Sequence, residues 1–244
     1  MIQDFSRGFF YALGGLREVG NPVLRRFVVI PLLINVLLFA VVIWGAAELF
    51  STWLDSIFSW LPDWLGFLNW LLWPMFIVTV LLMVFYLFTV VANLLGSPFN
   101  GLLSEKAELH LYPGTVLPYS GPLWKEVVRA PWIEIRKLMY VLVWVIPLLL
   151  LFLIPGINAL APLLWWAFGA WVLALEYLDY PMSNHAVRLG RQRTLLAEHR
   201  PLALGFGTAI LLLTLVPVVN FVVMPAAVIG ATRLWAERLR PPQL

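Results

Sequence analysis

The chain has 244 residues, of which 62% are hydrophobic and only 12% are charged. Because a soluble fold could not hide so much apolar surface from water, this composition excludes a soluble globular protein and predicts a membrane protein. The absence of cysteine excludes disulfides and thiolate chemistry, and the net charge of +3 indicates membrane orientation rather than nucleic-acid binding.

Four stretches carry no charged residue, and each is about as long as the roughly 20 residues that a spanning helix needs, or longer. They are residues 27–47, 64–104, 138–175 and 201–232. Their apolar runs lack the strict alternation that a transmembrane β-barrel requires. The sequence therefore predicts an all-α integral membrane protein with a single membrane domain over residues 1–244.

The first elements in chain order are an interfacial helix and two long spans. Residues 1–20 place apolar side chains at helical spacing, which is typical of an amphipathic helix lying in the inner membrane interface. Asn21 suits the cap of the following helix and Pro22 its first turn. Span one is thus predicted over residues 22–50, and span two over residues 64–95.

The basic residues set the expected topology. All 16 Lys and Arg residues lie in residues 1–26, 105–137, 176–200 and 233–240, whereas residues 48–63 carry only acidic charges. The positive-inside rule places residues 48–63 outside and both termini in the cytoplasm. Each of the two later apolar blocks must then leave the inner side and return to it.

The later blocks are therefore predicted to be helical hairpins over residues 138–175 and 202–235. Arms of the second hairpin are shorter than the ~30 Å hydrocarbon core at ~1.5 Å per residue. We expect re-entrant hairpins that stop partway, with six complete spans as the alternative. A proline is expected to end the first arm of each hairpin, and Asn158 and Asn220 to cap the second arms.

Two further local features accompany the first hairpin. A second amphipathic interfacial helix is expected over residues 123–139, with a break at Pro131. At the end of the hairpin lie Glu176 and Asp179, which we interpret as partners of arginines in structural ion pairs.

Candidate chemistry is narrow. The sequence contains no His-Glu-x-x-His, Gly-x-Ser-x-Gly or phosphate-binding Gly-rich motif, and no acid lies within the apolar blocks. The sequence therefore predicts neither an enzyme nor a metal or cofactor site.

The sharpest constellation is Val23, Leu24, Arg25 and Arg26 at the start of span one. A helix start offers unpaired N–H groups and a positive dipole end, and two guanidiniums supply forked donors for an oxyanion such as sulfate. The simpler interpretation is a positive-inside anchor beside lipid phosphates, and the residues alone leave both open. The segment Gly15-Leu16-Arg17, with mobile backbone, is a weaker second candidate.

Polar side chains in the apolar blocks are costly in lipid and indicate pore lining, hairpin tips or interhelical hydrogen bonds. The candidates are Asn35, Asn93, Asn158 and Asn220.

Several ordered motifs over nearly the whole chain resemble the CysZ family of bacterial sulfate permeases. They are Arg25-Arg26-Phe27 leading to Pro31-Leu32-Leu33-Ile34-Asn35, Ala92-Asn93 with Pro98-Phe99-Asn100-Gly101-Leu102-Leu103-Ser104-Glu105, Ile154-Pro155-Gly156-Ile157, Tyr177-Leu178-Asp179-Tyr180-Pro181 with Asn184-His185, and Met224-Pro225-Ala226-Ala227-Val228-Ile229-Gly230-Ala231-Thr232.

The resemblance implies a bacterial inner-membrane (plasma-membrane) permease that brings sulfate into the cytoplasm for cysteine biosynthesis. It also implies two long transmembrane helices with two partly inserted hairpins, and a homo-oligomer, hexamers being described for the family. The family's sulfate-binding motif, Gly-Leu-Arg commonly followed by a second Arg, falls on Val23-Leu24-Arg25-Arg26. Val23 departs from the family Gly, which bears on how closely the backbone approaches the anion.

Two other functions remain open from the sequence. One is a non-transporting membrane scaffold or regulator of a partner transporter, supported by the small-residue pairs Ala170/Ala174 and Ala226/Gly230. The other is a permease for a related oxyanion such as sulfite, thiosulfate or molybdate.

Overall fold

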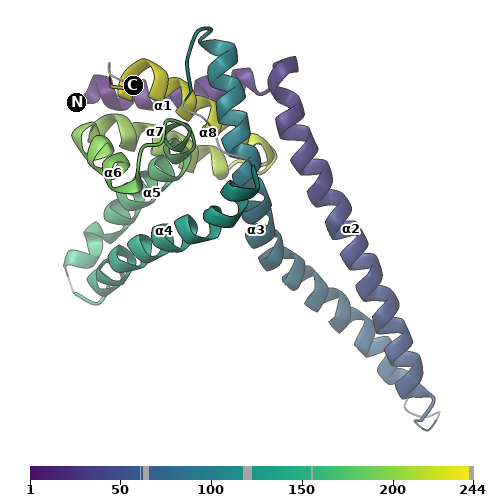
Figure 1. Ribbon diagram of the computed structural model, residues 1–244. Coiled ribbons are helices and arrows are strands. Elements are labelled where there is room, and N and C mark those ends of the chain that lie inside the picture. Colours follow the sequence, from purple (N-terminus) through teal and green to yellow (C-terminus); the bar gives the residue numbers. More distant parts are fainter. Residues whose placement is uncertain (61, 63–65, 118–122, 155, 242–244) are drawn as a thin grey trace. The chain divides into compact units, whose positions relative to one another are not determined.

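The structure is a computed structural model of the whole chain, and it describes residues 1–60, 62, 66–117, 123–154 and 156–241. Every regular element among these residues is helical, as predicted (Figure 1). In chain order they are α1 (Ile2–Glu18), α2 (Pro22–Phe58), α3 (Phe67–Leu111), α4 (Leu123–Leu151), the short η2 (Ile157–Leu160), α5 (Ala161–Asn184), α6 (Leu189–Glu198), α7 (Arg200–Thr214), α8 (Pro217–Leu234) and η3 (Trp235–Leu239).

The chain groups into two compact units. The smaller is Val29–Gly96, which holds most of α2 and much of α3. An aromatic cluster joins its two helices: Phe50 stacks on Phe76 with ring centroids 3.9 Å apart, and Trp73 meets Phe50 edge-on at 5.3 Å. Such pairs hold two helices together where their outer faces are left to lipid.

The larger unit comprises Met1–Val28 and Ser97–Leu244. Its core is formed mainly by α5, α7 and α8, with large side chains such as Phe206, Ile210 and Trp235 fully buried. Both the N-terminal helix α1 and the C-terminal helix η3 belong to this unit, and a hydrogen bond from Tyr11 to Glu237 joins them (Figure 1).

Two segments of the described chain are long and apolar enough to cross a membrane, Val36–Ile57 and Asn158–Asn184. Two apolar helical segments are shorter, Trp70–Met83 and Arg200–Thr214. The predicted long helices are present, and the helices extend beyond the predicted spans: α2 continues to Phe58 and α3 to Leu111. The span bounds themselves stay predictions. Hydropathy could not indicate either extension, because a helix can continue through charged residues once it leaves the bilayer.

The helix predicted in residues 1–20 is present, and it packs on the rest of the larger unit through its small residues. Its buried residues are Gly8, Ala12 and Gly15, while the large apolar residues are only partly buried. A Cβ added to Gly8 would lie 2.0 Å from the Leu202 carbonyl oxygen of α7. Small residues let the two backbones touch, so the face that packs is the one without bulk rather than the most hydrophobic one.

The helix boundaries correct sequence expectations for residues 123–139 and for both hairpins. The break expected at Pro131 is absent, because α4 runs through this position; losing one hydrogen bond there leaves fewer unpaired backbone groups than ending a helix. Pro217 begins α8 rather than ending α7, and Val216 takes the cap position, so Asn220 lies within the helix and caps nothing. Asn158 lies inside η2, whose cap position is Gly156.

Among the described residues of the hairpin tips, Gly156 has a backbone conformation that requires glycine. Its φ of 85° lies in the left-handed region that only glycine adopts without strain. The neighbouring Pro155, expected at the turn, lies outside the described residues.

Candidate functional site

The start of α2 is capped as the sequence predicted. Pro22 is the first helical residue, and the Asn21 side-chain oxygen accepts a hydrogen bond from the Val23 N–H at 3.1 Å. The N–H groups of Leu24 and Arg25 donate to the Asn21 carbonyl oxygen at 3.0 and 2.8 Å. These bonds fix the direction in which the first turn leaves the connection from α1.

The same bonds occupy the backbone donors that the sequence analysis expected to be free. Pro22 has no N–H, and those of Val23, Leu24 and Arg25 are all paired with Asn21. An anion at this helix start therefore meets side-chain donors first.

The four predicted site residues divide by helix face. Leu24 is completely buried and belongs to the core of the larger unit, whereas Val23 is 40% exposed and both Arg25 and Arg26 are exposed. The Arg26 guanidinium lies 4.9 Å from the centre of the Phe27 ring, a cation–π contact that limits its freedom. The buried Leu24 thus anchors a turn that presents two guanidiniums to the surroundings.

His110 also belongs to this site, and the sequence analysis did not select it. It lies in the last turn of α3, and its Nε2 is 3.1 Å from Nδ2 of Asn21. A neutral imidazole accepting this bond would hold the Asn21 amide with its oxygen toward the Val23 N–H. No sequence spacing connects residues 89 positions apart, so only the fold reveals this contact.

The weaker candidate, Gly15-Leu16-Arg17, is not a mobile segment. A Cβ on Gly15 would lie 1.9 Å from the Ala226 carbonyl oxygen, so this stretch of α1 is pressed against α8. Its glycine serves helix packing.

Among the asparagine candidates, Asn158 and Asn220 have exposed side chains at the two hairpin turns. The side chains of Asn35 and Asn93 lie outside the described part of the structure. The assignment of these four residues to a pore or to hairpin tips therefore stays a prediction.

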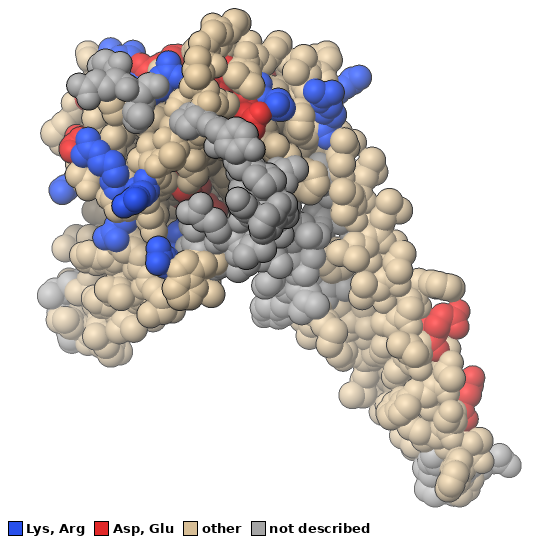
Figure 2. Space-filling model, viewed as in Figure 1, with Lys and Arg blue, Asp and Glu red and all other residues tan. Residues whose placement is uncertain are grey.

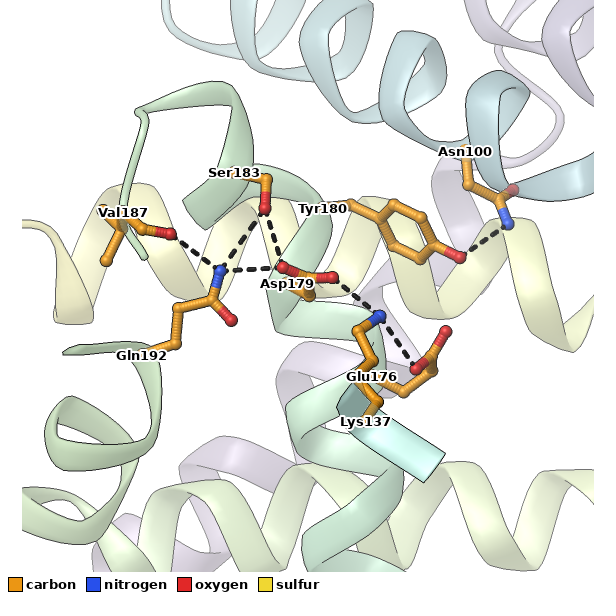
Figure 3. Close-up of polar contacts among 8 residues, drawn as sticks. All are labelled: Asn100, Lys137, Glu176, Asp179, Tyr180, Ser183, Val187 and Gln192. Atoms are coloured by element: carbon orange, nitrogen blue, oxygen red, sulfur yellow. Dashed lines mark hydrogen bonds and ion pairs between the residues drawn. The ribbon is translucent and has the colours of Figure 1, made fainter. Parts of the chain in front are cut away.

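The acids at the end of the first hairpin form the ion pairs that were expected, but with a lysine. Nζ of the buried Lys137 in α4 lies 2.7 Å from Oδ2 of Asp179 and 3.1 Å from Oε2 of Glu176 (Figure 3). Ser183 and Gln192 each donate to the other Asp179 oxygen at 2.7 Å. The cluster ties α4, α5 and α6 together, and buried charges of this kind require such full pairing.

A second buried ion cluster joins α3 to the chain end. Glu108 is fully buried, and its Oε1 accepts from His185 at 2.9 Å and from Arg240 at 3.1 Å. On the face shown in Figure 2, Lys and Arg side chains gather over the larger unit, while the described part of the smaller unit near the α2–α3 connection shows acidic side chains. No group of three or more metal-ligating side chains occurs among the described residues.

Comparison with known proteins identifies the class to which these features belong. The family described as sulfate transporter CysZ/etoposide-induced protein 2.4 matches residues 11–225. Sulfate transporter CysZ of Pectobacterium atrosepticum is 44% identical over 241 residues, which are 97% of this chain and 87% of that protein. Sulfate transporter CysZ of Pseudomonas paraeruginosa is 44% identical over 227 residues, which are 91% of this chain and 92% of that protein.

The chain belongs to this family. The resemblance drawn from the sequence motifs is therefore confirmed. The family description names a transporter, in agreement with the prediction that the chain is not an enzyme.

The structure also explains several CysZ-like motifs as packing contacts. Asn100 donates to the Tyr180 hydroxyl at 3.3 Å (Figure 3), and the Asn184 amide donates to the Gly101 carbonyl at 3.2 Å. These two bonds join a motif of α3 to a motif of α5. A third motif, in α8, contacts the same part of α3 through the 2.9 Å hydrogen bond between the Ser104 and Thr232 hydroxyls.

Proposed function

We propose that this chain is an inner-membrane sulfate transporter that carries sulfate into the cytoplasm for cysteine biosynthesis. The observation that carries the proposal is its 44% identity, over 97% of its length, to a protein named sulfate transporter CysZ. The geometry at the start of α2 suits the same anion, since two exposed guanidiniums stand on a turn held in the core by Leu24.

Sulfate binds, in this proposal, to Arg25 and Arg26. Each guanidinium can donate two parallel hydrogen bonds to a tetrahedral oxyanion. The Val23 N–H joins them when the Asn21 side chain turns aside, because this cap is the one bond that occupies it. The Val23 side chain, which is 40% exposed, leaves sulfate less room to approach the backbone than the glycine of the family motif would.

The route beyond this site involves the hairpins, which we propose are re-entrant from the cytoplasmic side. At about 1.5 Å per residue, the 15-residue α7 reaches about 22 Å and the 18-residue α8 about 27 Å, against a core of about 30 Å. The positive dipole ends of α5 and α8 lie at the hairpin turns, where they favour an anion without a buried cation.

Orientation and assembly complete the proposal. The basic segments and both termini face the cytoplasm, and the chain is multi-pass. Backbone at membrane depth is tolerated only where protein or water covers it, so the tips are covered in a homo-oligomer such as a hexamer, with lipid around it.

The first test is uptake of radiolabelled sulfate into liposomes that contain the purified protein. Arg25→Ala/Arg26→Ala is expected to reduce uptake by at least about tenfold, since two charge-assisted contacts are lost. The matched control is Arg188→Ala/Arg191→Ala, which removes the same charge from exposed positions around α6. Uptake lost in the first variant and kept in the control supports both transporter and site.

Other outcomes of the uptake measurement would test the transporter, its anion site and its substrate separately. Wild-type uptake that the Arg25/Arg26 variant retains leaves a transporter whose anion site lies elsewhere. Absence of sulfate uptake in folded wild type, with uptake of sulfite, thiosulfate or molybdate, would change the substrate.

A non-transporting scaffold loses its sequence support, because Ala170 and Ala226 are buried within this chain against α7 and α1.

A further inference from the structure

A pocket of about 270 Å³ lies between the N-terminal helix and the end of the chain, both parts of the larger unit. Helix α1 lines it on one side, and α8 with η3 on the other. The lining residues are Ser6, Arg7, Phe10, Tyr11, Arg233, Glu237 and Arg238. We call this the α1–η3 pocket.

The α1–η3 pocket is basic. Three guanidiniums face one carboxylate in its lining, a net charge of +2. The carboxylate, Glu237, is already engaged: Tyr11 donates to its Oε2 at 2.6 Å and Tyr112 to its Oε1, while Arg233 lies 3.8 Å away. Glu237 also attracts Arg238, but a single carboxylate shared among these groups leaves the lining with its positive excess.

Two of the three arginines are accessible. Arg238 is exposed, and Arg7 keeps 48% of its side chain exposed. The partner of Arg7 is Asp4 at 3.5 Å, which also pairs with the N-terminal amino group at 3.3 Å. Both guanidiniums can thus turn donors toward an anion that enters the pocket.

Large apolar side chains flank the pocket on the same stripe of α1. Ile2, Ser6 and Phe10 follow each other at intervals of four residues, and Ile2 is 88% and Phe10 66% exposed. The opposite stripe is pressed against α7 and α8 through Gly8 and Gly15, so α1 cannot turn to bury them. Exposed apolar residues beside arginines are typical of a helix in the headgroup region of a bilayer.

We propose that the α1–η3 pocket binds the phosphate of an acidic phospholipid headgroup. Arg7 and Arg238 contact the phosphate oxygens, and the Ser6 hydroxyl is a further donor in the lining. Ile2 and Phe10 enter the boundary between headgroup and acyl chains. The exposed apolar side chains beside the pocket favour a lipid over a free anion, because a free phosphate has no apolar part to contact them.

The test measures lipid retained by the purified full-length protein in native mass spectrometry, after exchange into equal mixtures of phosphatidylglycerol and phosphatidylcholine. Wild type is expected to retain phosphatidylglycerol preferentially. Arg7→Gln/Arg238→Gln is expected to lower that preference at least about tenfold, since each basic residue near an anionic headgroup contributes separately. Arg188→Gln/Arg191→Gln, the matched control on exposed arginines, is expected to keep it.

A second variant, Phe10→Ser, leaves all charges in place and is expected to weaken retention of both lipids. Equal loss in the two arginine variants would overturn the proposal, because it would reflect overall charge. Stabilisation of wild type by inorganic phosphate, without any preference between the lipids, would assign the pocket to a free anion instead. No sulfate is present in these measurements, so their outcome is independent of sulfate uptake and of Arg25 and Arg26.

Discussion

At the residue scale, the first turn of α2 separates anchoring from exposure. Leu24 is fully buried while Arg25 and Arg26 are exposed, because residues one and two positions apart point to different sides of a helix. Sequence reasoning could select all three from the cap, the proline and the paired arginines. It could not select His110, whose contact with Asn21 depends on where α3 ends.

If Arg25 and Arg26 bind sulfate through paired hydrogen bonds from each guanidinium, another positively charged side chain will not restore the affinity. Arg25→Lys/Arg26→Lys is expected to keep the net charge but to weaken sulfate binding by roughly tenfold, because lysine offers a point charge without bidentate geometry. Isothermal titration of the detergent-solubilised variant with sulfate measures this. Wild-type affinity in the lysine variant would show that only the local potential matters.

The junction around Glu237 gives a pH dependence whose sign follows from its contacts. Burial raises the pKa of this carboxyl, but hydrogen bonds from Tyr11 and Tyr112 and the nearby Arg233 and Arg238 lower it below the ordinary 4.5. A lowered pKa means that the ionised carboxyl stabilises the fold above about pH 4.5, and that this stabilisation is lost as the pH falls through the lower folded-state pKa.

We therefore expect the melting temperature of wild type to fall more steeply in acid than that of Glu237→Gln. Melting curves in detergent at pH values from 6 down to 3 measure the difference. Parallel curves for the two proteins would mean that Glu237 does not contribute to the acid sensitivity.

At the scale of elements, contacts between helix backbones determine the packing of the larger unit. A Cβ on Gly207 of α7 would lie 1.7 Å from the Ala170 carbonyl oxygen of α5, and one on Gly205 would lie 1.9 Å from the Phe5 carbonyl oxygen of α1. Hydropathy cannot foresee this, because glycine contributes little to an apolar pattern. It also explains why α1 packs against the larger unit through Gly8, Ala12 and Gly15 rather than through its large apolar side chains.

Gly207→Ala is accordingly expected to destabilise the protein by about 1–3 kcal/mol, as overpacking forces α5 and α7 apart. Gly190→Ala is the matched control, because nothing lies within 4 Å of its added Cβ in α6. Its effect should stay within about 1 kcal/mol, the range of helix propensity between these residues. Unfolding in mixed detergent measures both, and equal effects would contradict the close contact.

At the scale of the whole molecule, the open question is how deep the second hairpin reaches. Because the sequence contains no cysteine, single substitutions provide clean labelling sites. Ser56→Cys is expected to react with a membrane-impermeant maleimide added outside intact cells, and Thr194→Cys only after permeabilisation. Asn220→Cys at the tip is expected to stay unlabelled from outside, because short re-entrant arms stop partway.

Labelling of Asn220→Cys from outside at the rate of Ser56→Cys would instead establish complete spans. Ser56→Cys and Thr194→Cys also test the orientation, because Ser56 lies in an acidic segment and Thr194 in a basic one. A reversed pattern, with Thr194→Cys labelled first, would place the basic segments outside.

The sequence by itself determined the helical membrane class, the capped start of α2 and the family. Each depends on local information: composition, a cap and proline at fixed spacing, and ordered motifs. Only the tertiary structure decided that Lys137 pairs with Glu176 and Asp179, and that Glu108 joins His185 to Arg240. These partners come from helices far apart in the chain, and a sequence pattern carries no information on which helices pack together until the backbone contacts at small residues are known.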